Sequence, residues 1–142
     1  LMPYVENADL FNCPSSQQRY DPGEPGASYN MSIGCNVWSM YYPGWSGHEL
    51  SLAQCTYPAE TMIFADSARA HPSDPNNMDY NGHYIVQMGP FGTHSSNRGK
   101  VAARHNNGAN ITYIDGHTKW MSAQDVPDQG ESSILWYAAA TK

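Results

Sequence analysis

Short apolar runs alternate with longer polar stretches along this chain. Residues 61–65 read as a buried strand that ends at Asp66, and residues 84–88 as another short strand. Residues 28–45 are rich in aromatic and β-branched types and predict a strand pair interrupted near Gly34. Turn-forming residues fill the stretches 14–28 and 67–82. The pattern therefore predicts short strands joined by long loops.

Helical spacing is confined to short segments. The first eleven residues, LMPYVENADLF, space their apolar side chains as an amphipathic helix does, and the predicted helix ends before Cys13. Residues 50–55 predict one further helical turn, and the apolar residues 133–140 fit a final strand or helix.

The strongest local signal lies in residues 104–120, RHNNGANITYIDGHTKW. Asn106-Asn107-Gly108 predicts a turn, residues 109–114 a strand, and Asp115-Gly116 the connection to a second strand at 117–121. Together with the N-terminal signal, this hairpin predicts an α+β fold. In it a short N-terminal helix packs on an antiparallel β-sheet with long loops and a C-terminal β-hairpin.

The composition narrows the class of protein. A chain of 142 residues fits one domain, residues 1–142, and 12 Gly, 10 Pro, 10 Tyr and 4 Trp favour a turn-rich sheet fold. The net charge of −6 and the lack of a Lys or Arg cluster disfavour nucleic-acid binding. The longest apolar run, 134–140, is too short to span a membrane, which needs about 20 apolar residues, so any anchor is expected upstream. The start at Leu1 suggests a processed or partial chain.

Three cysteines, Cys13, Cys35 and Cys55, lack C-x-x-C spacing, which argues against a zinc ribbon or a thioredoxin-type redox site. In an exported chain one disulfide and one free thiol are expected, and all three pairings stay open. The pair Cys13 and Cys35 would close a loop rich in Gly and Pro.

His105 is followed, after nine residues, by Asp115-Gly116. Residues 3–15 (PYVENADLFNCPS), 28–31 (SYNM) and 57–67 (YPAETMIFADS) accompany this motif in a fixed order. In combination they resemble prepilin-type proteins related to major pseudopilins and type IV pilins, over most of the chain. The resemblance implies a pilin-like globular domain of an exported bacterial protein. Members usually also carry an N-terminal hydrophobic helix for membrane anchoring and filament assembly, and this chain lacks that segment.

The sequence offers residues for two kinds of metal site. His105, Asp115 and His117 together offer a zinc ligand set, as in a metal-dependent hydrolase. We favour a structural role instead, in which Asp115 accepts amides of its own turn and His105 bonds a carbonyl or the Asp115 region. Calcium is the preferred metal, since it takes oxygen ligands from irregular loops. Its candidate ligands are Asp66, Asp74, Asp79 and Asp115. Of the two explanations of these residues, we favour ordinary solvated loop carboxylates over a calcium site.

Contact and modification sites are suggested by two further patterns. Trp38, Tyr41, Tyr42 and Trp45 surround Pro43-Gly44, and such aromatics either bind sugar rings or partners, or pack in the core. Asn30 and Asn110 each begin an N-glycosylation acceptor triplet.

No nucleophile elbow and no glycine-rich phosphate loop is present in the sequence, so we predict that the protein is not an enzyme. The expected function is that of a structural subunit of an extracellular filament, a pilus or a pseudopilus-like fibre, whose partners are copies of itself. The alternative is a monomeric cell-surface module that binds polysaccharide or protein through residues 38–45.

Overall fold

The computed structural model describes residues 7–16, 23, 30–39, 52–69, 82–87, 89, 99–128 and 133–136. Strands predominate in these residues, and the named helical elements are two short 3-10 turns, η1 (Ala8–Phe11) and η3 (Leu52–Gln54). The strands are β1 (Ile33–Asn36), β2 (Met62–Arg69), β3 (Ile85–Val86), β4 (Gly99–Val101), β5 (Gly108–Tyr113) and β6 (Thr118–Ser122).

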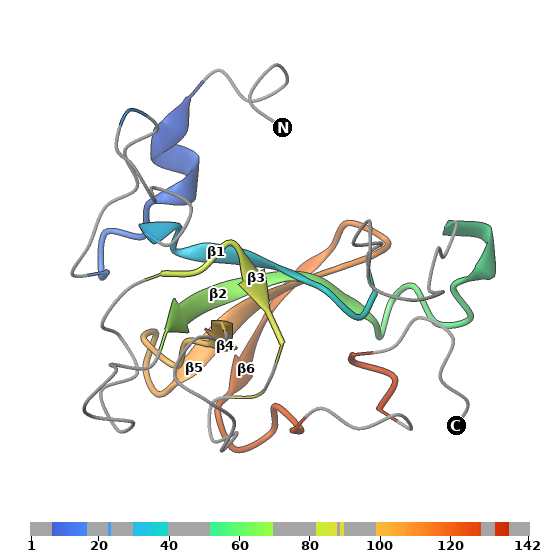
Figure 1. The fold of residues 1–142 in the computed structure, drawn as a ribbon. Coiled ribbons are helices and arrows are strands. Elements are labelled where there is room, and N and C mark those ends of the chain that lie inside the picture. Colours follow the sequence, from blue (N-terminus) through green and yellow to red (C-terminus); the bar gives the residue numbers. More distant parts are fainter. Residues whose placement is uncertain are drawn as a thin grey trace.

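One mixed sheet connects all six strands, in the order β3-β1-β2-β5-β6, with β4 also paired to β2 (Figure 1). Strand β2 is central because it pairs with β1 along one side and with β5 and then β4 along the other. These pairs are antiparallel, whereas β1 and β3 are parallel.

The two ends of this sheet differ. Beyond β3, the amide of Gln87 donates to the carbonyl of Gly99 at 2.9 Å, so β3 also lies beside β4. Strands β1, β2, β4 and β3 thus form a closed circuit of neighbours. At the opposite end, β6 pairs with β5 and has no second strand neighbour within the described residues.

The core lies between the sheet and the segments that follow β6. Burial of these apolar side chains is the main stabilising contribution to the fold. The core side chains are Met62, Ala65, Val86, Val101, Ala109, Ile111, Tyr113, Val126, Leu135 and Trp136, with Trp38 and Met121 packed against them.

The predicted N-terminal helix is wrong, and with it the α+β class. Residues 8–11 form one 3-10 turn that buries none of its side chains, and Leu10 is 62% exposed. The side chain of Asn7 caps this turn by accepting from the amide of Asp9 at 2.9 Å, and Asn12 is already extended. Residues 1–6 lie outside the described part. The described fold is therefore a mixed β-sheet, with η1 near the start of β1 (Figure 1).

Two strand predictions need correction as well. The predicted break near Gly34 is absent, because β1 continues through this residue, whose missing side chain admits the carbonyl of His83 and the Cβ of Ser67. Strand β2 does not end at Asp66 but continues to Arg69. The polar residues are tolerated there because their side chains find hydrogen-bond partners: Asp66 binds Asn110, and Ser67 donates to the carbonyl of Met31.

Other predictions are confirmed. The β5–β6 hairpin, the short strand β3 and the helical turn η3 all fall within the predicted ranges or one residue beyond them. The loop of the hairpin is Ile114-Asp115-Gly116, closed by the amide of Tyr113 on the carbonyl of His117 at 2.9 Å. Gly116 has φ +94°, as expected for the last residue of a three-residue hairpin loop.

The final apolar segment is neither strand nor helix where it is described. Residues 133–136 form a turn, and Trp136 is fully buried with Nε1 donating to the carbonyl of Pro127 at 2.8 Å. The carbonyl of Leu135 accepts from the amide of Met62. Residues 137–140 lie outside the described part. None of the described helical elements has the length and hydrophobicity needed to cross a membrane.

Candidate metal centre

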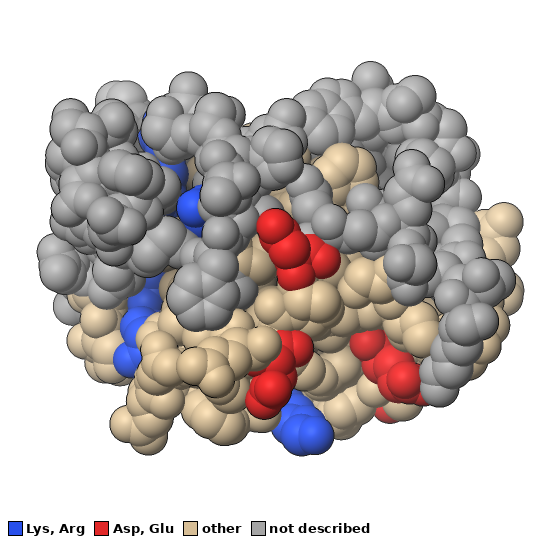
Figure 2. Space-filling model, turned by 90° about the horizontal axis from the view of Figure 1, so that it is seen from below, with Lys and Arg blue, Asp and Glu red and all other residues tan. Residues whose placement is uncertain are grey.

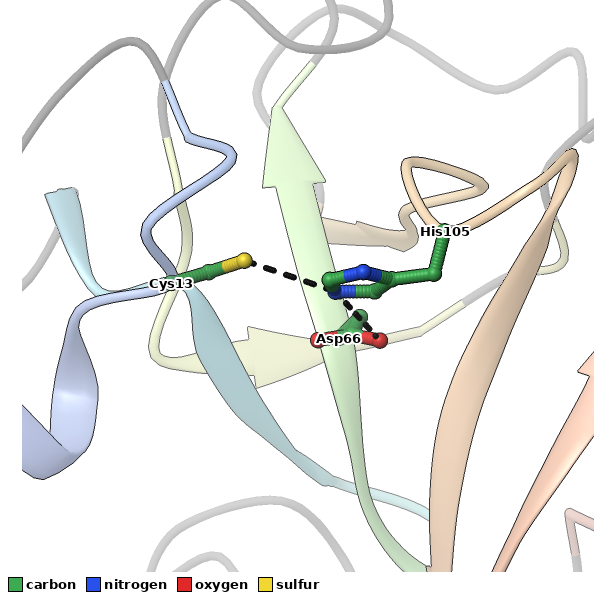
Figure 3. A group of neighbouring side chains, drawn as sticks. All are labelled: Cys13, Asp66 and His105. Atoms are coloured by element: carbon green, nitrogen blue, oxygen red, sulfur yellow. Dashed lines mark hydrogen bonds and ion pairs between the residues drawn. The ribbon is translucent and has the colours of Figure 1, made fainter.

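Three side chains from separate segments meet at one end of β5 (Figure 3). Cys13 follows η1, Asp66 lies in β2, and His105 precedes β5. The Sγ atom of Cys13 lies 3.4 Å from Nε2 of His105, and the same Nε2 lies 3.5 Å from Oδ2 of Asp66. All three potential ligand atoms lie within 4.8 Å of one another. We refer to these three residues as the CDH cluster.

The position of His105 is set by a tight turn. Asn106 and Asn107 have φ values of 52° and 57°, and His105 and Gly108 exchange two main-chain hydrogen bonds of 3.0 and 3.1 Å. Positive φ at both central residues defines a type I′ turn, which asparagine tolerates better than most residues. The predicted turn at 106–108 is thereby confirmed, and it holds His105 beside the first residues of β5.

Asp66 is buried, and its carboxylate is oriented by β5. Its residue is 6% exposed, and Oδ2 accepts the main-chain amide of Asn110 at 2.7 Å and the Nδ2 of the same residue at 3.2 Å. The register of the strands explains this contact. Ala65 is opposite Ile111, and because β2 and β5 are antiparallel, the next position places Asp66 opposite Asn110. A buried carboxylate requires such donors.

A main-chain hydrogen bond made by Phe11, two residues before Cys13, holds this segment beside the sheet. The amide of Ser32 donates to the carbonyl of Phe11 at 2.8 Å, which joins the N-terminal segment to the residue before β1. Cys13, Cys35 and Cys55 are all free thiols in the structure, so the predicted disulfide between Cys13 and Cys35 is not formed there. Burial raises the pKa of the Cys35 thiol above its ordinary value, the opposite of what a reactive thiol needs.

Arg104, next to His105, fixes the strands around the cluster. Its guanidinium donates to the carbonyl of Ser67 at 2.7 Å and to that of Ser32 at 3.2 Å. It thereby joins β2 to the residue that precedes β1. Because arginine can donate in several directions at once, a single side chain is enough to hold both main chains.

The arrangement of the cluster suits ligand binding better than nucleophilic catalysis. In a catalytic triad, one ring nitrogen of the histidine faces the nucleophile and the other faces the carboxylate. Here Sγ and Oδ2 both face Nε2. Three donor atoms of sulfur, nitrogen and oxygen that converge on one point can hold a metal ion.

His105 and Asp115-Gly116, the predicted motif, lie at opposite ends of β5. The nine residues between His105 and Asp115 comprise the type I′ turn, β5 and Ile114. Asp115 instead contacts His117, with Oδ1 2.6 Å from Nδ1 and 3.1 Å from the main-chain amide. The structural role predicted for Asp115 thus agrees with the geometry, whereas His105 does not reach the Asp115 region.

The Asp115–His117 pair is a separate, exposed feature. The imidazole of His117 stacks on the ring of Tyr113, with ring centroids 4.3 Å apart and planes at 6°. Hydrogen bonds from the His117 side chain and then from its main-chain amide lower the pKa of Asp115. The zinc set of His105, Asp115 and His117 is therefore not assembled in the structure.

The calcium ligand set is likewise not assembled within the described residues. Asp66 lies beside Asn110 near the start of β5, and Asp115 follows the end of that strand. Asp74 and Asp79 lie outside the described residues. Oxygen ligands to calcium must lie within about 2.6 Å of the ion, so Asp66 and Asp115 cannot share one.

Of the predicted contact aromatics, only Trp38 is described. It packs against the core, and its Nε1 donates to the carbonyl of Gln87 at 3.1 Å. Tyr41, Tyr42 and Trp45 lie outside the described residues. Trp38 therefore matches the core interpretation.

Of the two asparagines in predicted N-glycosylation triplets, Asn30 is half-buried, and Asn110 is exposed with its side-chain amide on Asp66.

The charged side chains bear on nucleic-acid binding. On the face drawn in Figure 2, the described Lys and Arg side chains lie mostly along one side, and the Asp and Glu side chains form separate small groups. Among described residues this face offers no broad basic surface for a phosphate backbone.

Comparisons of the chain with protein-family models, with curated proteins and with solved structures gave no match.

The sequence singled out each member of the CDH cluster, but for different roles. The sequence patterns point to a disulfide for Cys13, to calcium for Asp66 and to the motif with Asp115-Gly116 for His105. Cys13 and His105 are 92 residues apart, so no local spacing relates them. Only the pairing of β2 with β5 and the attachment of the N-terminal segment to β1 bring the three together.

Proposed function

We propose that this chain is the globular part of an exported structural subunit that assembles with copies of itself into an extracellular filament. The observation that carries the proposal is the outer edge of β6, which has no strand neighbour among the described residues. Exposed strand edges are templates for pairing with another chain. The sequence resemblance to prepilin-type proteins supports the same class of function, although the contact proposed here is made by a strand and involves no N-terminal helix.

The main-chain groups of β6 that face outward follow from the hairpin register. The amide of Tyr113 donates to the carbonyl of His117, which makes these two a hydrogen-bonded pair. Pairs alternate along an antiparallel ladder, so the amides and carbonyls of Thr118 and Trp120 point away from β5. An extended segment of a neighbouring subunit could bind these groups as an added strand.

The side chains along β6 also suit a protein contact. Trp120 is 46% exposed, and tryptophan is enriched at the centres of protein interfaces. Lys119 is also exposed, and charged edge residues oppose indiscriminate pairing. Two β6 edges that pair with each other would give a closed two-fold dimer, whereas a different segment on β6 gives an open polymer. The filament proposal therefore requires a donor segment other than β6.

The test compares two substitutions at one edge residue. Thr118→Pro removes an outward-facing amide and the hydroxyl that bonds the hydroxyl of Thr112 in β5 at 3.0 Å, while it leaves the main-chain bonds to β5. Thr118→Val removes the same hydroxyl but keeps the amide. Electron microscopy and light scattering of the parent chain and both variants report assembly. We expect filaments from the parent and from Thr118→Val, and none from Thr118→Pro.

Two outcomes would contradict the proposal. A parent chain that remains monomeric under all assembly conditions would exclude the filament function. Specific binding of that monomer to polysaccharide would favour a surface-binding module. Filaments that form equally well from Thr118→Pro would exclude the edge of β6 as the contact. Circular dichroism of the three proteins checks that each is folded.

A further inference from the structure

Two of the three separations within the CDH cluster match those around a tetrahedral metal ion. Zinc binds sulfur at about 2.3 Å and nitrogen or oxygen at about 2.0–2.2 Å, so tetrahedral angles separate the sulfur and nitrogen by about 3.5 Å and the nitrogen and oxygen by about 3.4 Å. The corresponding separations here are 3.4 Å from Cys13 to His105 and 3.5 Å from His105 to Asp66. The third separation, Cys13 to Asp66, is at most 4.8 Å.

Hydrogen bonding alone accounts poorly for this convergence. A neutral imidazole carries at most one proton on Nε2, and that proton points along one line. Sγ of Cys13 and Oδ2 of Asp66 both face this single nitrogen, and Oδ2 already accepts two bonds from Asn110. A cation between the three atoms would instead be bound by all of them.

Charge balance favours a divalent ion. Metal binding requires the thiolate form of Cys13, so one proton leaves the thiol as the metal enters. A thiolate, a carboxylate and a neutral imidazole together carry two negative charges, which a divalent cation neutralises. This matters because the side chain of Asp66 is only 7% exposed. Sulfur and nitrogen ligands select zinc-like transition metals over calcium.

The surroundings supply support and access. The two bonds from Asn110 orient the carboxylate of Asp66, as residues behind a metal ligand commonly do. The His105 side chain is 28% exposed, so solvent reaches the cluster and can supply a fourth ligand such as water.

We propose that Cys13, Asp66 and His105 bind one zinc-like divalent metal ion, with a fourth position open to water. The ion joins the N-terminal segment to β2 and to the turn before β5. The site does not depend on filament formation. It shares Asp66 with the calcium set predicted from the sequence, but its other ligands are a thiol and an imidazole instead of carboxylates.

The test uses cobalt(II) as a spectroscopic substitute for zinc, added to the reduced full chain as a monomer. Thiolate bound to cobalt gives a near-ultraviolet charge-transfer band, and tetrahedral geometry gives visible bands. We expect both with one equivalent of cobalt, and their loss when zinc is added. Cys13→Ser should abolish the charge-transfer band, because it removes the thiolate. His105→Gln should weaken zinc binding at least tenfold.

Matched controls change the same residue types elsewhere. Cys55→Ser and His117→Gln should bind cobalt as the parent does.

Asn110→Ala, which removes one of the two bonds to Asp66, should weaken zinc binding about tenfold. The absence of a thiolate band in the folded parent, or a band that persists in Cys13→Ser, would overturn the proposal. Because binding is measured on monomers, either result leaves the filament proposal to its own test.

Discussion

The indole of Trp120 lies across the α-carbon of Gly108, and its Nε1 donates to the carbonyl of His105 at 2.7 Å. One side chain of β6 therefore covers the start of β5 and also holds the turn that positions the imidazole of the CDH cluster. A side chain at position 108 would meet the indole atoms Cε2 and Cζ2 at 2.5 Å and would also meet the carbonyl oxygen of Met121.

Gly108→Ala should destabilise the protein because the added methyl group displaces this indole. Forced overpacking typically reduces the free energy of unfolding by about 1–3 kcal/mol. Urea denaturation of the parent, Gly108→Ala, Trp120→Ala and the double variant measures the coupling. We expect Gly108→Ala to cost less once Trp120 is absent. Strictly additive losses would show that the indole does not oppose the methyl group.

Gly116 is required for a different reason. Its φ is +94°, and a Cβ there would have no heavy atom within 4 Å, so only the main-chain conformation opposes a side chain. Gly116→Ala should therefore lower the free energy of unfolding by about 1–2 kcal/mol. Gly116→Asn should lose less, because asparagine enters left-handed conformations more readily. Equal losses for Asn and Ala in urea denaturation would refute this explanation.

Asn36 joins three segments from a fully buried position. Its Nδ2 donates to the carbonyls of Met62 at 3.0 Å and Trp136 at 2.9 Å, and its Oδ1 accepts the amide of Trp38. Asn36→Ala should cost about 1–3 kcal/mol, because the carbonyl of Trp136 loses its donor while that of Met62 keeps the hydroxyl of Ser39 at 2.7 Å. Thermal and urea unfolding measure this loss. Val37→Ala, a substitution at a neighbouring buried position that removes no polar group, is the control.

Asn36→Asp gives a pH-dependent version of the same test. A carboxyl group buried beside two carbonyls should have a raised pKa, because burial and the two carbonyl oxygens that face it disfavour the charged form. Its contribution to stability is then present below the ordinary pKa and lost as the pH rises through the raised value. The variant should therefore be more stable, relative to the parent, in mildly acidic than in neutral buffer. A constant difference between the two proteins would contradict the assignment.

His83 should make the protein less stable in acid. Burial lowers its pKa below the ordinary 6.5, a hydrogen bond with Ile85 opposes this shift, and the charge of Arg69 adds to it. The unfolded chain thus takes up a proton at a higher pH than the folded chain does. Stability is expected to fall as the pH drops below about 6.5 and to level off below the folded pKa.

Urea midpoints between neutral and mildly acidic pH test this contribution. Each unit by which the pKa is lowered corresponds to about 1.4 kcal/mol of lost stability once both states are protonated. Because the chain has other histidines besides His83, the comparison is with His83→Asn. An identical pH dependence in the parent and this variant would exclude His83 as the source.

Much of the hairpin could be predicted because its determinants are local. Asn106 and Asn107 tolerate positive φ, Gly116 accepts +94°, and the apolar residues between them suit a strand. These preferences act within a few residues and are readable without the rest of the fold. The predicted N-terminal helix is wrong because a short helix needs a buried apolar face to stabilise it, and none of the side chains of residues 8–11 is buried; Asn7 caps a single turn.

Contacts between distant segments could not be read in the same way. Asp66 resembled the end of a strand because it is charged, and only the amides of Asn110 make it acceptable within β2. Gly34 resembled a break, although the strand needs a residue without a side chain there to admit the carbonyl of His83. In both cases the partner is far away in the sequence.

The sequence by itself determined the residue types and the tight turns on either side of β5. Tertiary structure decided which residues meet: it separated His105 from Asp115, paired Asp115 with His117, and brought Cys13 and Asp66 to His105. The physical reason is that turn geometry depends on the φ preferences of adjacent residues, whereas a cluster of side chains depends on strand register. Register is set by burial of the whole sheet.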